Sequence, residues 1–339
     1  MILDHRSAHA SQPLSRRDFL RLAVLSAAGA LLPACSPPAA PTPTALPSTS
    51  TPPPPEATST PNPRQFEVLA SSLAFPEGPA FAPDGSLYCT EMDQSNLIHL
   101  VDGKVERIPL RGRPNGLAFD RRGRAWVADS RNMLIQRYDP AAGQWKTMAE
   151  TVDGQPLLMP NDLCFDAAGS LLFTCPNFAD DARSGYVCCL SPDGALTKIA
   201  ESYYRPNGLE IVDGGAALVV ADTTQKTLFK GAWDAAARRW TDVQPWAKVG
   251  GAEGPDGMAF GADGRLYQAI FGDGVVRVVN QDGKVVEELF TGGMNPTNVA
   301  IDPSGKLGLV VTETERGRLL SFPHLNPGAA LFDGGDAWD

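Results

Sequence analysis

Residues 75–81 read Phe-Pro-Glu-Gly-Pro-Ala-Phe, in which a proline, a polar residue and a small residue lead into an apolar stretch. The pattern occurs six times, with its proline at Pro76, Pro114, Pro160, Pro206, Pro255 and Pro296. Each copy continues through a Gly-containing turn into a second run rich in β-forming residues, such as Leu87-Tyr88-Cys89 after Gly85. The sequence therefore repeats one strand–turn–strand unit.

The spacing of the copies predicts the fold. Successive copies start 38 to 49 residues apart, and periods of this size with several short strands are typical of β-propeller blades. Third strands are expected at 134–138, 186–190, 274–279 and 318–322. We predict an all-β, six-bladed propeller of four-stranded blades over residues 65–323, followed by a weakly ordered tail over 324–339. We expect residues 66–70 to supply the outer strand of the last blade and so close the ring.

The N-terminal residues have the features of an export signal. Arg16-Arg17 precede an apolar run that ends in Leu-Pro-Ala-Cys35, and this run is too short for a membrane-spanning helix. Residues 1–34 resemble a twin-arginine signal peptide of the lipoprotein type, which predicts lipidation at Cys35. Residues 35–64 are rich in Pro, Thr and Ser and are expected to form an extended, disordered linker. We therefore expect an exported lipoprotein that faces the periplasm or the cell exterior.

Composition limits the classes of partner. The chain has 339 residues, a net charge of −10 and a pI near 4.9, and an acidic chain of this kind lacks the basic surface that nucleic acids require. The expected partners are a small-molecule substrate and, through Cys35, a membrane. The folded head is expected to be monomeric.

The residue after each repeat proline offers a side-chain oxygen. In order, these residues are Glu77, Asn115, Asn161, Asn207, Asp256 and Thr297, and equivalent positions in equivalent blades should lie around the central channel at similar depth. Carboxylate and amide oxygens suit a hard divalent cation, and Ca²⁺ accepts a ring of fixed ligands more readily than Mg²⁺ does. The set contains no Cys or His, which argues against Zn²⁺. Pro-Asn-Gly and Pro-Asp-Gly are also common turn sequences, but a turn does not explain Glu77.

These motifs, above all residues 75–79, 160–162, 206–209 and 255–258, resemble those of the family of regucalcin and the bacterial gluconolactonases, and of the related diisopropyl-fluorophosphatase. The resemblance implies a six-bladed propeller with one catalytic divalent cation. From the oxygen donors we expect this cation to be Ca²⁺, with Zn²⁺, Mg²⁺ or Mn²⁺ as the other choices. It implies four metal ligands, Glu77, Asn161, Asn207 and Asp256. Asn115 then lies near the substrate. Met159 stands where regucalcin has a substrate-binding Arg, and Thr314 where the phosphatases have a His.

The resemblance implies hydrolysis of a lactone or similar ester. The metal would polarise the carbonyl group, Asp256 would act as the general base, and Asn115 and Asn161 would orient the substrate. The alternatives are a non-catalytic exported propeller that binds ligands or proteins and holds a structural Ca²⁺, a metal site kept only for stability, and, less favoured, a quinone-dependent sugar dehydrogenase. No repeat start contains His, so a Ser-His-Asp triad has little support.

Two further groups of residues are interpreted as structural. Apart from Cys35 the chain has five Cys, namely Cys89, Cys164, Cys175, Cys188 and Cys189; we expect buried thiols, with a local disulfide as the alternative. Acidic residues end the second strand of four blades, at Glu91, Asp129, Asp222 and Glu313. We expect them to bond the turn of the neighbouring blade.

Overall fold

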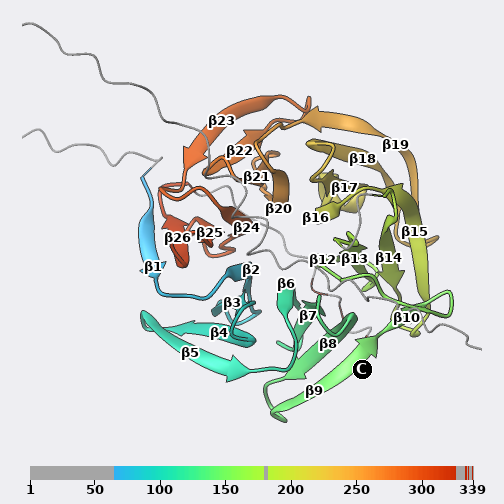
Figure 1. The fold of residues 1–339 in the computed structure, drawn as a ribbon, viewed down its shortest axis with the longest axis horizontal. Coiled ribbons are helices and arrows are strands. Elements are labelled where there is room, and N and C mark those ends of the chain that lie inside the picture. Colours follow the sequence, from blue (N-terminus) through green and yellow to red (C-terminus); the bar gives the residue numbers. More distant parts are fainter. Residues whose placement is uncertain (1–64, 179–181, 326–332, 334, 336–337, 339) are drawn as a thin grey trace, which may run out of the picture. The chain divides into compact units, whose positions relative to one another are not determined.

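The computed structural model describes residues 65–178, 182–325, 333, 335 and 338. These residues form six four-stranded antiparallel sheets arranged around a central axis, as Figure 1 shows. The predicted all-β, six-bladed propeller is confirmed. Five blades are built from four consecutive strands with the first strand innermost, and the last blade takes its outer strand from the N-terminal end of the propeller. The predicted segments 1–34 and 35–64, including Cys35, lie outside the described residues. Among the described residues, no helix is long and apolar enough to span a membrane.

The strands of blades 1 to 3 follow one another from the innermost strand outward. Blade 1 consists of β2 (Pro76–Phe81), β3 (Leu87–Glu91), β4 (Asn96–Val101) and β5 (Lys104–Pro109). Blade 2 consists of β6 (Pro114–Phe119), β7 (Ala125–Asp129), β8 (Leu134–Asp139) and β9 (Gln144–Ala149). Blade 3 consists of β12 (Leu163–Phe165), β13 (Leu171–Cys175), β14 (Gly185–Leu190) and β15 (Leu196–Tyr203). A short hairpin, β10 (Thr151–Val152) with β11 (Gln155–Pro156), precedes blade 3.

Blades 4 to 6 have the same plan. Blade 4 consists of β16 (Pro206–Val212), the 3₁₀ turn η1 (Asp213–Gly215), β17 (Ala217–Asp222), β18 (Thr227–Asp234) and β19 (Arg239–Lys248). Blade 5 consists of β20 (Gly254–Phe260), β21 (Leu266–Phe271), β22 (Val275–Val279) and β23 (Val285–Phe290). Blade 6 consists of β24 (Pro296–Ile301), β25 (Leu309–Glu313), β26 (Arg318–Phe322) and, as its outer strand, β1 (Glu67–Ala70).

The ring closes as the sequence predicts. Strand β1 pairs antiparallel with β26, with Glu67 opposite Ser321 and Val68 opposite Leu320. Residues from the two ends of the propeller thus share one sheet, which Figure 1 shows as the blue strand beside the red blade. Closure of this kind leaves the last blade with the same number of strands as the others.

The core lies between the blades. Six apolar clusters occur, one between each pair of neighbouring blades. In the cluster between blades 2 and 3, for example, the rings of Trp126 and Phe165 meet edge to face with centroids 5.6 Å apart. Such burial fixes each blade against the next, so the innermost strands are held in a closed ring around the axis.

The penultimate residue, Trp338, lies in the segment 324–339 that we expected to form a weakly ordered tail, and it packs against the propeller. Its side chain is buried, and its ring centroid lies 4.7 Å from that of Trp126. The indole Nε1 donates a hydrogen bond to the Gly169 carbonyl oxygen at 2.7 Å, and the Arg124 guanidinium donates to the Trp338 carbonyl oxygen at 3.0 Å. Trp338 therefore joins blade 2 to blade 3 at the turns between their first and second strands.

The cysteines are free, as expected, and no disulfide joins any of the five that the structure describes. Four of them have no exposed surface, and Cys164 is partly buried. Burial raises the pKa of the Cys189 thiol to about 11 and raises the pKa of Cys89 still further. Cys89 and Cys189 therefore stay protonated and serve as apolar packing groups.

Candidate metal centre

The predicted ring residues come together at one end of the six innermost strands. Five of them lie within β2, β6, β16, β20 and β24, and Asn161 lies just before β12. Neighbouring innermost strands contact one another around the whole ring. All six residues are buried, with exposed fractions of 0% for Thr297 to 8% for Asp256. The structure therefore places the six positions equivalently, as the repeat predicts.

A β-bulge marks the ring position in five of the six innermost strands. In β2, for example, Glu77 pairs with Thr90 and Ala80 pairs with Tyr88, so the inner strand has one extra residue between the pairs. The same irregularity follows the ring position or its proline in β6, β16, β20 and β24. Bulges bend a strand and change the direction of its side chains, and they are common beside functional sites.

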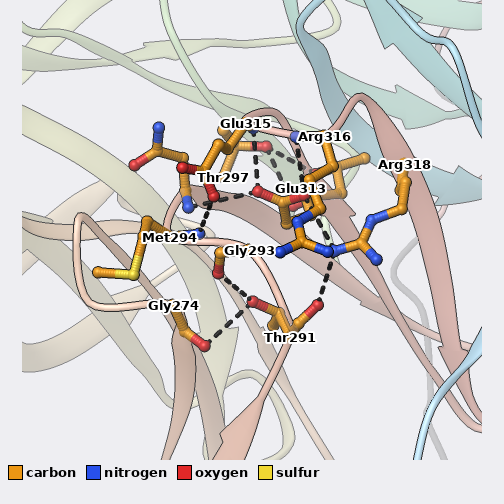
Figure 2. Close-up of polar contacts among 11 residues, drawn as sticks. Gly274, Thr291, Gly293, Met294, Thr297, Glu313, Glu315, Arg316 and Arg318 are labelled. Carbon is orange, nitrogen blue, oxygen red and sulfur yellow. Dashed lines mark hydrogen bonds and ion pairs between the residues drawn. The ribbon is translucent and has the colours of Figure 1, made fainter. Parts of the chain in front are cut away.

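Acidic side chains anchor the start of each of four innermost strands. Glu91, Asp129, Asp222 and Glu313 accept hydrogen bonds from backbone N–H groups of Ala74, Arg113, Tyr204 and Asn295, which lie one or two residues before the repeat proline of the same blade. Our expectation that they bond a neighbouring blade is wrong, although their structural role is confirmed. Figure 2 shows Glu313, which also accepts bonds from the N–H groups of Glu315 and Arg316 and from the Arg318 guanidinium.

Side chains of the second strands hold the ring backbone. The Thr90 hydroxyl donates to the Asn115 carbonyl oxygen at 2.6 Å, and the Thr174 hydroxyl donates to the Asn207 carbonyl oxygen at 2.8 Å. Each of these bonds runs from one blade to the next. In blade 5, Gln268 Nε2 donates to the carbonyl oxygen of Asp256 at 3.0 Å. The backbone carbonyl oxygens of Asn115, Asn207 and Asp256 are thus already engaged in hydrogen bonds.

Thr297 has a different role from the other five. Its hydroxyl donates to the Pro76 carbonyl oxygen at 2.9 Å and lies 2.8 Å from the Thr312 hydroxyl. The first of these bonds connects blade 6 to blade 1, and the second lies within blade 6. The resemblance did not assign Thr297 to the metal, and its contacts are those of a structural residue.

The residue after each ring position is Gly in four blades, and the structure gives the reason. A Cβ atom on Gly116 would lie 2.5 Å from Asp162 Oδ1 and 2.7 Å from Asp162 Cα, and one on Gly208 would lie 2.4 Å from the Asp256 carbonyl oxygen. No side chain fits there because the next blade passes too closely. The two blades without Gly at this position have Asp162 and Asn298 instead.

Asp162 and Asn298 form a bridge that sequence reasoning missed. They come from blades 3 and 6, which lie opposite each other in the ring, and Asn298 Nδ2 donates to Asp162 Oδ2 at 3.3 Å. Burial raises the pKa of Asp162 to about 7, and the nearby Asp256 carboxylate adds to the shift. The signal in the sequence was the departure of these two copies from Gly.

A cavity of about 400 Å³ occupies the other part of the channel. Asp162 and Asn298 line it, as do the later residues of the innermost strands, but none of the six ring residues does. The bridge thus lies between the ring and this cavity. The cavity was not predicted, because its wall is made of residues such as Ala80 and Ala118 that carry no chemical signal in the sequence.

Two residues at which the chain departs from the proteins that it resembles lie beside the ring. Met159 directly precedes Pro160 and has a left-handed backbone with φ of 53°. Thr314 follows Glu313, and its hydroxyl is a buried group for which the described residues supply no hydrogen-bond partner. Neither residue offers a positive charge or an imidazole.

The donor set of the ring fits a hard cation. Glu77, Asn161, Asn207 and Asp256 present carboxylate and amide groups, and all four residues are at least nine-tenths buried. Among the described residues, no cluster of three or more His, Cys, Asp or Glu could hold a metal ion. The set of four expected metal ligands differs from such clusters because two of its members are amides. Oxygen-only donors of this kind match Ca²⁺ better than Zn²⁺.

Fold and ring together define a six-bladed propeller with an oxygen-lined polar end to its central channel. The profile of the SMP-30/Gluconolactonase/LRE-like region matches residues 75–315. The chain belongs to this family. The match starts one residue before Pro76 and ends two residues after Glu313, so it covers all six innermost strands.

Individual relatives share less than a third of their aligned residues with this chain. A gluconolactonase of Zymomonas mobilis is 29% identical over 182 residues, which are 46% of this chain and 51% of that protein. The lactonase drp35 of Staphylococcus saprophyticus is 24% identical over 233 residues, covering 64% of this chain and 70% of that protein. The chain therefore spans about half the length of the gluconolactonase that it matches.

Solved structures share the fold. A gluconolactonase from Xanthomonas campestris superposes with a TM-score of 0.68 at 25% identity, covering 75% of this chain and 88% of that one. A calcium-binding regucalcin from Agrobacterium tumefaciens superposes with a TM-score of 0.70 at 20% identity, covering 78% of this chain and 95% of that one. At the latter identity the likeness shows the fold alone.

Proposed function

We propose that the chain is a metal-dependent hydrolase that opens a sugar lactone or a similar ester. The observation that carries the proposal is the buried ring of Glu77, Asn161, Asn207 and Asp256 at one end of the channel. Membership of the gluconolactonase family supports it, as does the similarity to a gluconolactonase and to lactonase drp35.

Five of the six ring residues have a proposed role in the reaction. Glu77, Asn161, Asn207 and Asp256 would hold one divalent cation, most suitably Ca²⁺, which would supply Lewis-acid polarisation of the ester carbonyl. Asp256 acts as the general base that accepts a proton from the attacking water. The Asn115 and Asn161 amides orient the substrate hydroxyls. The bonds from Thr90 and Thr174 to the ring backbone keep these side chains in position.

A non-catalytic role is the second candidate, and Met159 and Thr314 favour it. Neither residue can bind or activate a substrate as an Arg or His can. In this alternative the ring holds Ca²⁺ for stability, and the protein binds a ligand or another protein. Both candidates share our proposal that residues 1–34 direct export and that a lipid on Cys35 anchors the protein to a membrane.

Hydrolysis of a lactone panel tests the proposal. Sugar, homoserine and aromatic lactones are offered to the purified protein before and after chelation, and Ca²⁺, Mg²⁺, Mn²⁺ and Zn²⁺ are then added back singly. Chelator-sensitive turnover that Asp256→Ala abolishes, and that Asp102→Ala at an exposed site leaves intact, would support the hydrolase. Absence of turnover with a metal-dependent rise in melting temperature would favour the non-catalytic candidate. Full activity of Asp256→Ala would contradict the role of Asp256.

A further inference from the structure

The cavity beyond the Asp162–Asn298 bridge has the character of a ligand site. It measures about 400 Å³, within the usual range for small-molecule sites, and most of its lining is apolar. Residues such as Phe81, Phe119 and Ile301, which come from different blades, contribute to its wall. An apolar cavity with few polar groups is the usual setting for selective binding of a small molecule.

Small residues leave this space open. The fourth residue after each repeat proline lines the cavity, and in four blades it is Ala: Ala80, Ala118, Ala259 and Ala300. The same position is Cys164 in blade 3 and Glu210 in blade 4. Glu210 is thus the one carboxylate in a layer of otherwise small and apolar side chains.

Among the residues that the structure describes, Glu210 has no counter-ion. One carboxylate oxygen, Oε1, accepts the backbone N–H of Ile211 at 3.0 Å, and no described residue donates to Oε2. The other two acids of the lining are already paired, because Asp213 forms an ion pair with Lys230 at 2.8 Å and Asp162 accepts the Asn298 amide. The described lining includes no Lys, Arg or His. Burial raises the pKa of Glu210 to about 8, with a contribution from Asp162, as expected for a carboxyl group without a cationic partner.

We propose that this cavity binds an organic ammonium ion with an apolar body, the ammonium group donating hydrogen bonds to Glu210 and the apolar body lying against the apolar part of the lining. The positive charge of the ligand complements a cavity whose described lining has acidic but no basic side chains. Its apolar body complements the apolar part of the same lining. This activity is separate from the proposed hydrolysis, because the Asp162–Asn298 bridge lies between the cavity and the ring.

Binding of a matched pair of probes tests this proposal. 2-Phenylethylammonium and its neutral counterpart 2-phenylethanol are titrated calorimetrically into the full chain near pH 8, where about half of Glu210 is ionised. We expect the ammonium ion to bind and the alcohol to bind at least about tenfold more weakly, because it lacks the charge-assisted bond. Equal binding of the two probes would overturn the proposal.

Two variants and one control locate the site. Glu210→Gln keeps the size of the side chain and should weaken ammonium binding about tenfold to a hundredfold. Ala300→Leu reduces the cavity volume without changing its charge and should weaken binding of both probes. Glu67→Gln, on the exposed β1, should bind as the parent does. Parent-like ammonium binding by Glu210→Gln would overturn the proposal, and so would failure of the parent to bind the ion.

Failure of this inference is distinguishable from failure of the proposed hydrolase. The calorimetric measurement needs neither a metal nor turnover, so a chain without lactonase activity can still bind the ammonium ion. Asp256→Ala, which removes the proposed general base, should leave ammonium binding unchanged. A loss of binding in Asp256→Ala would place the probe at the ring and contradict the assignment to the cavity.

Discussion

Asn298 in blade 6 donates a hydrogen bond to Asp162 in blade 3 across the propeller axis, at 3.3 Å. Each residue also accepts a backbone N–H with its Oδ1, Asp162 from Leu163 and Asn298 from Val299. Neither side chain can move far without losing one of these bonds. The pair therefore connects opposite blades and separates the ring of the candidate metal centre from the cavity.

Asp162 and Asn298 should be coupled in their contributions to the free energy of unfolding. Asp162→Ala and Asn298→Ala should each lower the free energy of unfolding by about 1–3 kcal/mol, because each leaves a buried polar partner unsatisfied. The double variant should lose less than the sum of the two, with a coupling of about 0.5–3 kcal/mol. Denaturant unfolding of all four proteins gives this value. Strict additivity would show that the bond contributes nothing to stability.

Gly116 should tolerate no side chain. In Gly116→Ala the new Cβ meets the backbone of Asp162 at 2.7 Å, so blades 2 and 3 must separate. We expect a loss of at least about 3 kcal/mol, the upper end of the usual cost of overpacking. Gly85→Ala is the control, because its Cβ has no neighbour within 4 Å and its cost arises only from the positive φ of 86°. Equal melting temperatures for the two variants would refute the close approach.

Trp338 should stabilise the propeller although it lies at the C-terminus. Trp338→Ala removes the contact with Trp126 and the bond to Gly169, and should cost about 3 kcal/mol, as for other buried Trp residues. Trp246→Ala serves as the control, because Trp246 is partly exposed and should cost less. Chemical unfolding of the two variants measures the difference. A Trp338→Ala variant as stable as the parent would show that this docking is unimportant.

Glu210 should make stability depend on pH. Its pKa is about 8 in the folded protein, against 4.5 as the ordinary value of a Glu. Between these values the folded state binds more protons than the unfolded chain, so the free energy of unfolding falls as the pH rises from 4.5 to 8. The loss is a few kcal/mol at most, because one pKa unit corresponds to about 1.4 kcal/mol.

Glu210→Gln removes this dependence. Its melting temperature should match that of the parent near pH 4.5 and exceed it above pH 8. Asp162, whose pKa is raised to about 7, contributes in the same window but is present in both proteins. Glu67→Gln should follow the parent at every pH. If the curves of Glu210→Gln and the parent run parallel, Glu210 does not titrate between these values.

The fold could be read from the sequence because a propeller repeats its signal. Each Pro-polar-small motif begins an innermost strand, and the third strand expected at 318–322 coincides with β26. Closure by residues 66–70 followed from the need of the last blade for an outer strand. The contact of Trp338 with Gly169 could not be predicted, because no periodic pattern in the sequence connects the two residues.

The candidate site was predictable only in part. The ring positions followed from equivalence, since Asn115, Asn161 and Asn207 occupy the same place in three blades. The hydrogen-bond partners of the acids at the second-strand ends were predicted wrongly, because the sequence does not tell whether Glu91 bonds its own blade or the next. The role of Glu210 depends on the space around it, and that space results from the packing of six strands.

The seam between β1 and β26 has a consequence for biosynthesis. Translation proceeds from the N-terminus, so Glu67 is made early and its partner Ser321 is among the last residues of blade 6 to follow. Until then β1 has no partner, and the ring stays open with an unpaired edge on either side. Chains truncated before β26 therefore cannot close, and they expose edges that proteases and chaperones recognise. The seam allows only a chain translated as far as β26 to become a closed propeller.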